Sequence, residues 1–405
     1  MRLGILIPEF PGQTHIMFWR EVTALRAIGH DVQILSTRSD RTGLCNHAFA
    51  RCNHGAIYCW PPSLSRVCCS MLSRPRAALR ALLYALQVEK SGGLAKRLGL
   101  WGGALDLSES IRRRKLEHVH VHSAADAAHV MAMASMISGV PYSVRLHGDL
   151  DAYGGDHGAK FARAAFVLSA SRLHIVEAVN RQVVKQGRHG CVPMGVDVSK
   201  VIRREGWLGG PIRIVTVARL NRAKGHEIAL KALSQCHDDG VDFRYTIVGG
   251  GELRPVIERQ IVDLGLEGLV TMRGSLDSED VASELSNNDV FLLPSIGIGE
   301  AAPVSVMEAM AAGLAVVCSA IGDTPDMVRD GVDGFVTKQG DVRGIAMAIQ
   351  RLHSDRDLLE RCGESARLRA IEDFDSAKQA QRLLEWIQGC PLESDLAEHR
   401  PRATG

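Results

Sequence analysis

The stretch from Asp289 to Glu308 constrains this chain most, because its sequence, DVFLLPSIGIGEAAPVSVME, changes character twice. The pattern predicts a buried strand over Val290–Leu293, then a loop with two glycines, then a helix that opens near Pro303. Unpaired amides and the positive dipole end converge at such a helix start, which favours anions. With Glu300 and Glu308 beside it, the stretch indicates a ligand that carries phosphate and hydroxyls, such as a nucleotide sugar.

The N-terminal segment predicts a unit of alternating strands and helix. It alternates a strand (Leu3–Ile7), a loop, a helix (Ile16–Ile28) and a strand (Val32–Ser36), which is a βαβ unit of a parallel sheet. The loop PEFPGQTH follows the first strand, where open α/β sheets bind ligands. Gly12 in this loop either lets the backbone approach a substrate or belongs to a plain turn, and the stretch alone favours neither.

Histidines mark two further strands. His118, His120 and His122 alternate with valines and therefore share one face of a strand. They suggest a metal, but no carboxylate or cysteine completes a convincing set. His147 follows the predicted strand Tyr142–Leu146 and precedes a glycine, so we expect it on the functional rim of the sheet.

The second half repeats the alternation. The strand Ile212–Ala218 is followed by Arg219 and Lys224, and two cations in such a turn either clamp a diphosphate or are simply solvated. The glycine cluster at 249–251 does not match the dinucleotide fingerprint, and no P-loop lysine is present. These patterns exclude dehydrogenases and P-loop NTPases.

Length and charge predict two domains of different character. The 405 residues exceed one ordinary core. We expect an α/β domain at 1–200, a second at 201–375, a C-terminal helix at 376–390 that could pack back on the first domain, and a polar tail at 391–405. Residues 1–200 hold 25 Lys and Arg against 14 Asp and Glu, and the remainder holds 23 against 32. A basic first half indicates an anionic partner.

That partner could be a membrane surface. Residues 61–116 contain basic segments with helical apolar spacing, which either contact anionic headgroups or form a pair of helices packed on the sheet with solvated basic faces. No stretch reaches the length of a spanning helix, and the N-terminus lacks a signal peptide, so we expect a cytoplasmic protein with at most peripheral membrane contact. Nucleic acid is not expected, because no binding motif is present.

Cysteine usage indicates reduced thiols. The ten cysteines are scattered without the density of a disulfide-rich domain. One segment places Cys45, His47, Cys52, His54 and Cys59 at similar spacings. This spacing matches no common zinc pattern, and a partly buried loop with small polarisable side chains explains it better.

Together these motifs resemble the retaining glycosyltransferases of family 4, which have the GT-B fold of two Rossmann-like α/β domains facing across a cleft. The resemblance covers nearly the whole chain and rests on VARLNRAKGHEIALKAL, VGGGELRPVIE, GEAAPVSVMEAMAAGLAVV and DGVDGFV. The opening segment, PEFPGQTHIMFWREVTALRAIGHDV, is further similar to the branch that builds exopolysaccharide, capsule or colanic acid.

The resemblance implies roles at matching positions. It places Arg219 and Lys224 at the donor diphosphate, Glu308 at the ribose, Glu300 at the transferred sugar and His147 near the reacting sugar. It also implies that further residues bind the donor through the base, the phosphates or the sugar: Gly12, Arg273, Gly274, Ala302, Pro303, Val304 and Ser305.

The implied reaction is transfer with retention and without a metal or other cofactor, to an acceptor that we expect to be a polyprenyl-diphosphate-linked glycan. Two departures from the family pattern stand out. Ala301 replaces the usual glycine after the first glutamate, and the turn Ile321–Asp326 lacks one glycine and one glutamate. Two other readings stay open: a nucleotide-sugar 2-epimerase of the same fold, and a non-catalytic assembly partner.

Overall fold

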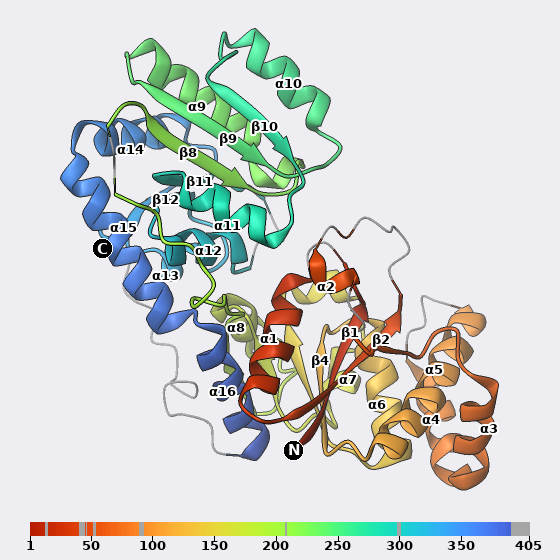
Figure 1. Cartoon of the computed structure of the whole chain (residues 1–405). Coiled ribbons are helices and arrows are strands. Elements are labelled where there is room, and N and C mark those ends of the chain that lie inside the picture. Colours follow the sequence, from red (N-terminus) through yellow and green to blue (C-terminus); the bar gives the residue numbers. More distant parts are fainter. Residues whose placement is uncertain are drawn as a thin grey trace. The chain divides into compact units, whose positions relative to one another are not determined.

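The computed structural model describes residues 1–12, 15–39, 45, 47–51, 54–88, 93–206, 209–297 and 301–389, and for Arg51 the backbone alone. Glu300, Cys52 and the expected tail at 391–405 lie outside these ranges. The chain divides into two compact units (Figure 1). One consists of Met1–Cys45, Phe49–Pro193 and the C-terminal segment from Gln379, and the other mainly of Met194–Lys378.

The first unit is built on a seven-stranded parallel sheet in the order β3-β2-β1-β4-β5-β6-β7. Its strands are β1 (Arg2–Glu9), β2 (Asp31–Arg38), β3 (Ile57–Tyr58), β4 (His118–His122), β5 (Tyr142–Leu146), β6 (Val167–Ser169) and β7 (His189–Cys191). The chain runs from β1 outward to β3 and then returns to β4 on the other side of β1. Ligands bind at such a reversal, at the carboxyl ends of the two strands.

Helices cover this sheet, and one group forms a second layer. Helix α6 packs on β1, β4 and β5, while α4 and α5 pack on α6, and α3 packs on α5. Pro75 begins α4 and separates it from α3, so the segment 61–116 folds into three helices. The helices of this half of the chain are α1 (Ile16–Ala27), α2 (Ala48–Arg51), α3 (Leu64–Ser73), α4 (Pro75–Gln87), α5 (Gly93–Arg114), α6 (Asp126–Ser138), the 3-10 helix η2 (Leu150–Tyr153), α7 (His157–Phe161) and α8 (Arg172–Asn180).

The second unit has a six-stranded parallel sheet in the order β10-β9-β8-β11-β12-β13. Its elements are β8 (Ile212–Val217), η3 (Arg222–Lys224), α9 (His226–Asp238), β9 (Phe243–Val248), α10 (Arg254–Asp263), β10 (Val270–Gly274), α11 (Ser278–Ser286), β11 (Val290–Leu293), α12 (Val304–Ala312), β12 (Ala315–Ser319), α13 (Thr324–Met327), β13 (Gly334–Thr337), α14 (Val342–Ser354) and α15 (Arg356–Asp373). The reversal lies between β8 and β11.

Strand β11 shows why its sequence is apolar throughout. Val290 and Leu292 belong to one apolar cluster, beneath α9 and α14, whereas Phe291 and Leu293 belong to the other, beneath α12 and α15. Successive side chains of a strand point to opposite faces, so a strand that is covered on both sides must be apolar at every position.

A buried charge cluster fixes the start of β11. The Asp289 carboxylate is fully buried and pairs with Arg204 at 3.0 Å and with Arg213 at 2.9 Å. Arg204 belongs to the segment that precedes β8, so this cluster also ties that segment to the second unit. Buried charges are tolerated when they are paired in this way.

The C-terminal helix α16 (Ser376–Gln388) begins beside the segment that enters the second unit. A Cβ atom on Gly195 would lie 2.4 Å from the Cα of Ser376, so the two segments touch there. Farther along α16, Trp386 is buried and its ring centroid lies 5.4 Å from that of Phe166 in the first unit. No helix among the described residues is long and apolar enough to cross a membrane.

Candidate functional site

Each unit presents a group of polar side chains at the carboxyl edge of its sheet. In the first unit the group comes from α1, β4 and β5. His122 ends β4, His147 follows β5 directly, and Glu21 reaches them from α1. The described structure thus places His147 on the rim of the sheet, where its sequence position predicts it.

Glu21 is the centre of this group. One carboxylate oxygen accepts a hydrogen bond from Nη1 of Arg145 at 2.5 Å, and the other lies 2.7 Å from Nε2 of His122. Burial alone would raise the pKa of Glu21, but the Arg145 guanidinium and His122 hold it well below its usual value. Glu21 is therefore an anion and can only accept hydrogen bonds.

The anionic state of Glu21 determines the tautomers of two histidines. Because the carboxylate accepts, Nε2 of His122 carries the proton and donates. Burial lowers the pKa of His122, which is therefore neutral at pH 7, and its Nδ1 atom must accept. This Nδ1 lies 3.0 Å from Nε2 of His147, so His147 donates through Nε2.

His147 itself is held neutral. Burial and the nearby His122 and Arg145 keep its pKa well below the ordinary value. With the proton on Nε2, its Nδ1 atom is a hydrogen-bond acceptor. The backbone N–H of His147 donates to the Tyr153 hydroxyl at 2.9 Å, which holds the residue from a second side. The arrangement suits recognition of a ligand hydroxyl.

Aromatic ring contacts connect the predicted Gly12 loop to this group. The N–H of His15 donates to the Gly12 carbonyl at 2.9 Å. The ring of Phe18 lies 5.4 Å from the His15 ring and 5.3 Å from the His147 ring, between centroids. A Cβ atom on Gly12 would lie 2.6 Å from Nδ1 of His15, so a side chain at this position would displace the His15 ring.

The prediction that no carboxylate joins the β4 histidines is wrong. Among the described residues, Glu21, His120 and His122 offer ligand atoms within 4.8 Å of one another. However, Arg145 donates to the same carboxylate, and a metal ion there would lie beside a guanidinium cation and compete with its hydrogen bond. The hydrogen-bond chain explains the cluster without an ion. None of the described members of the Cys45–Cys59 segment belongs to a comparable three-ligand group.

In the second unit, the predicted cationic turn adjoins the loop before α12. Arg219 is exposed just after β8, and Lys224 ends η3. The N–H of Ile296 donates to the Ala223 carbonyl at 2.8 Å. A Cβ atom on Gly225 would lie 1.9 Å from the Pro294 carbonyl oxygen. The two loops on either side of the strand reversal are therefore in direct contact.

The glycine cluster at 249–251 serves this same packing. Gly249 has a φ of +146°, and a Cβ atom there would lie 1.9 Å from the Ala218 carbonyl oxygen. Leu220 donates its N–H to the Gly250 carbonyl at 2.9 Å, and Gly249 donates to the carbonyl of Gly274 at 2.8 Å. The cluster thus joins Arg273 and Gly274, at the end of β10, to the loop that carries Arg219.

Helix α12 provides the anion-receptive end that the sequence predicts. It begins at Val304, so Pro303 directly precedes it instead of lying within its first turn. The amides of Val304 and Ser305 are at its start, where no intrahelical acceptor exists, and no acidic residue lies in the first turn. Glu308 lies in the same helix, and Ala302 is partly buried just before it.

The two departures from the family pattern, Ala301 and the turn Ile321–Asp326, are in direct contact. The N–H of Asp323 donates to the carbonyl of Ala301 at 2.8 Å, which joins the turn after β12 to the residue that replaces glycine. Ala301 is not among the residues with positive φ, so the alanine costs no backbone strain here. Glu300, the preceding residue, lies outside the described ranges.

Comparisons with known proteins agree with this geometry. Residues 197–369 match the family model described as "Glycosyl transferases group 1". The match begins before β8, ends within α15, and includes Arg219, Lys224 and Glu308.

The similarity to two curated relatives extends beyond the matched residues. The chain is 27% identical to the amylovoran biosynthesis glycosyltransferase AmsK of Erwinia amylovora, with 87% of this chain and 90% of that protein covered. It is 26% identical to the putative colanic acid biosynthesis glycosyltransferase WcaL of Escherichia coli K12, with 96% and 100% covered.

Solved structures show the same fold. Anabaena Alr3699/HepE in complex with UDP has a TM-score of 0.74 at 17% identity, covering 96% of this chain and 100% of that one. A glycosyltransferase from Rickettsia africae has a TM-score of 0.73 at 15% identity, with 96% and 98% covered. The predicted fold class is confirmed: two Rossmann-like units with parallel sheets, as in GT-B glycosyltransferases.

Proposed function

We propose that the protein is a retaining glycosyltransferase of family 4 that moves a sugar from a UDP- or GDP-sugar to a glycan acceptor in exopolysaccharide biosynthesis. The observation that carries the proposal is the match of residues 197–369 to the group 1 family model. Within these residues, the turn with Arg219 and Lys224 adjoins the loop before α12. The names of AmsK and WcaL support the pathway. The acceptor is a polyprenyl-diphosphate-linked glycan.

The second unit binds the donor in this proposal. Arg219, Lys224 and the first amides of α12 neutralise the diphosphate and its growing charge as the sugar leaves. Glu308 accepts hydrogen bonds from the ribose, and Arg273 and Gly274 contact the base. Ala302 and Pro303 position the first turn of α12 against the donor. Glu300 binds hydroxyls of the transferred sugar.

The first unit supplies the acceptor side, with His147 and the Gly12 loop. Because Nδ1 of neutral His147 accepts hydrogen bonds, we assign it to a hydroxyl of the transferred sugar. The acceptor oxygen forms a bond to the anomeric carbon while the bond from that carbon to the diphosphate oxygen breaks. The nucleoside diphosphate leaves on the same face and takes the acceptor proton, so the anomeric configuration is retained. No metal takes part in this proposal.

The test uses nucleotide release. We expect the full chain, incubated with UDP- and GDP-sugars, to release free nucleotide slowly with one of them, and that donor to raise the melting temperature. Arg219→Ala should lower the release rate by about a hundredfold, since it removes a charge that acts on the leaving group. Arg259→Ala, on α10, is the control. If no nucleotide sugar binds or turns over, the proposal is wrong.

We also propose that the protein contacts an anionic membrane from the cytoplasmic side, through α4. Leu79 and Leu83 are 57% and 50% exposed, and Arg76 and Arg80 lie on the same exposed face of the helix. The opposite face, with Ala78 and Ala81, is buried against the unit. A helix with exposed leucines among arginines suits an anionic lipid surface.

Sedimentation with vesicles tests the membrane contact. The protein should sediment with vesicles that contain phosphatidylglycerol and stay in solution with pure phosphatidylcholine. Replacing Leu79 and Leu83 together by serine should reduce the sedimented fraction several-fold. Leu368→Ser is the matched control, because Leu368 is 59% exposed on α15. Equal recovery with both kinds of vesicle would show that there is no such surface.

A further inference from the structure

A cavity of about 300 Å³ lies in the first unit, at the carboxyl edge of its sheet. Its walls come from the ends of β2 and β3, from α5 and from the start of α6. The residues that line it are Thr37, Arg38, Cys59, Trp60, Ala95, Lys96, Gly99, Leu100, Gly103, Asp126 and Val130. Its volume is at the lower end of the range of about 300–1,000 Å³ for small-molecule sites, so its ligand is small.

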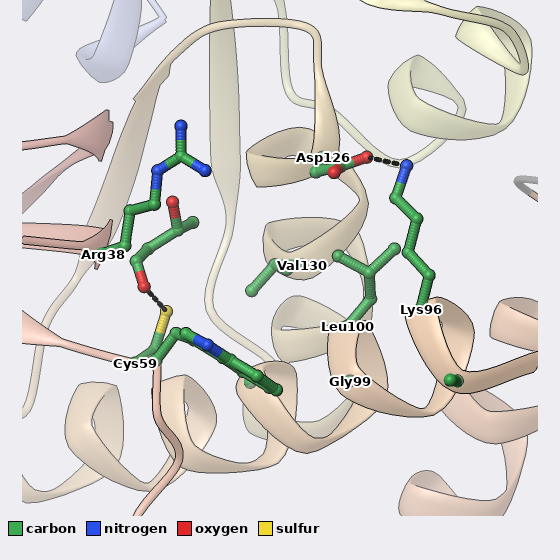
Figure 2. A pocket seen from close by; sticks show the side chains of 11 residues that line it. Arg38, Cys59, Lys96, Gly99, Leu100, Asp126 and Val130 are labelled. Carbon is green, nitrogen blue, oxygen red and sulfur yellow. Dashed lines mark hydrogen bonds and ion pairs between the residues drawn. The ribbon is translucent and has the colours of Figure 1, made fainter. Parts of the chain in front are cut away.

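Charged groups stand on two sides of this cavity. Figure 2 shows Arg38 on one side and the Lys96–Asp126 pair on the other, with Leu100 and Val130 between them. Nζ of Lys96 lies 3.1 Å from the Asp126 carboxylate. Nε of Arg38 donates to the carboxylate of Glu9 at 2.6 Å. Each cation has an acid beside it, so the cavity favours a neutral ligand that both donates and accepts hydrogen bonds.

An aromatic ring provides the remaining wall. Trp60 is 45% exposed, and its indole is seated on α5 at Gly99. A Cβ atom on Gly99 would lie 3.4 Å from two atoms of the indole, and one on Gly103 would lie 3.6 Å from the Cys59 carbonyl. These are ordinary van der Waals distances, so the segment after β3 packs on α5, and this packing holds the indole at the cavity. An exposed indole face packs against apolar C–H surface.

We propose that this cavity binds one neutral saccharide unit of the acceptor glycan. A sugar ring has a C–H face for Trp60 and neighbouring hydroxyls that pair with the Lys96–Asp126 and Arg38–Glu9 groups. Glu9 ends β1, directly before the loop that contains Gly12, so the cavity adjoins the loop that the proposed function assigns to the reaction. The inference rests on that proposed function for the nature of the acceptor.

The test is saturation-transfer NMR with the full chain and methyl glycosides of glucose, galactose and N-acetylglucosamine. At least one glycoside should receive magnetisation. Trp60→Ala and Lys96→Gln should each weaken its binding by about tenfold, because they remove the stacking surface and a charged hydrogen-bond donor. Leu64→Ala, at a position 80% exposed, and Lys115→Gln, at an exposed position, are matched controls that should bind as the wild type does.

Three results would overturn the proposal: no transfer to any glycoside, unchanged binding by both cavity variants, or displacement of the glycoside by inorganic pyrophosphate, which would assign a phosphate ligand. Circular dichroism of each variant shows that it is folded. UDP and GDP binding is measured in the same samples. If the wild type binds neither UDP nor GDP, the donor assignment is wrong. The glycoside result, in contrast, concerns the cavity alone.

Discussion

At the scale of single residues, Glu21 determines the state of its neighbours. We expect Glu21→Gln to lower the free energy of unfolding of the first unit by about 3–5 kcal/mol, because Arg145 is fully buried and loses its anionic partner. Tryptophan fluorescence during urea unfolding measures this, since Trp19, Trp60, Trp101 and Trp386, four of the five tryptophans, belong to the first unit.

Glu9→Gln is the control for this substitution. Glu9 pairs with Arg38 at 2.6 Å, but the two side chains are 25% and 52% exposed. Such exposed pairs contribute less than about 1 kcal/mol. Equal losses of unfolding free energy in the two variants would show that the buried pair contributes no more to stability than the exposed pair.

Gly225 offers a second test, of the contact between the two donor-side loops. Gly225→Ala should lower nucleotide affinity at least about tenfold, since the added methyl would overlap the Pro294 carbonyl and push the loop with Lys224 away. Gly240→Ala is the matched control, because Gly240 also has a positive φ, +79°, but nothing within 4 Å of its Cβ position. Isothermal titration with UDP and GDP measures both. Similar losses in the two variants would contradict the packing explanation.

Sequence reasoning identified the rim position of His147 but not its partners. His122 and Glu21 are 101 residues apart, and Arg145 is 124 residues from Glu21. Nothing local in the sequence of α1 distinguishes Glu21 from a solvated glutamate. The role of glycines 249–251 was equally hard to predict. These glycines are needed because a neighbouring loop packs closely on them, and the sequence does not show that contact.

At the scale of elements, strand β4 makes stability depend on pH. Burial lowers the pKa of His118 to about 4 and keeps that of His120 and His122 below the ordinary value. The unfolded chain binds these protons as the pH falls below about 6.5, whereas the folded chain does not until lower pH. The contribution of these neutral histidines to the free energy of unfolding is therefore complete above about pH 6.5 and is lost as the pH falls towards 4.

The contribution of His118 can be separated. His118→Gln should reduce the loss of unfolding free energy between pH 7.5 and 4 by up to about 3 kcal/mol, the equivalent of its pKa shift. Urea unfolding at several pH values measures this loss, and His237→Gln, an exposed position on α9, is the control. If the slope against pH is the same in His118→Gln and the wild type, buried His118 is not its source.

The predictability of elements depends on how local their signals are. The strands Tyr142–Leu146 and Val290–Leu293 were predicted with the bounds that the structure shows, because short apolar runs between polar residues specify them. The segment 61–116 was treated as a pair of helices and contains three. Its apolar spacing indicates helices, but which of them packs on α6 depends on tertiary contacts.

At the scale of the whole molecule, α16 links the end of the chain to the first unit. We expect Trp386→Ala to destabilise that unit by about 3–5 kcal/mol, because the buried ring packs against Phe166. Hydrogen exchange should quicken in peptides from β1 to β7 and stay unchanged from β8 to β13. Val262→Ala, at a position 57% exposed, is the control. Faster exchange in both units would show that α16 stabilises the second unit as well.

The two-sheet plan was predictable from the sequence because each βαβ repeat carries its own periodicity. The discontinuous first unit follows from contacts between segments that are far apart in the sequence, such as that of Phe166 with Trp386. Such contacts leave no periodic signal.

This discontinuity sets an order of events at the ribosome. The first unit begins to emerge before the second, but its final helical segment, from Gln379, is made only after all of Met194–Lys378. Until then Phe166 lacks the indole that covers it. Domains of a growing chain generally fold as they emerge, N-terminal first. In this protein the unit that starts first is therefore completed last, and its final packing step follows synthesis of the entire second unit.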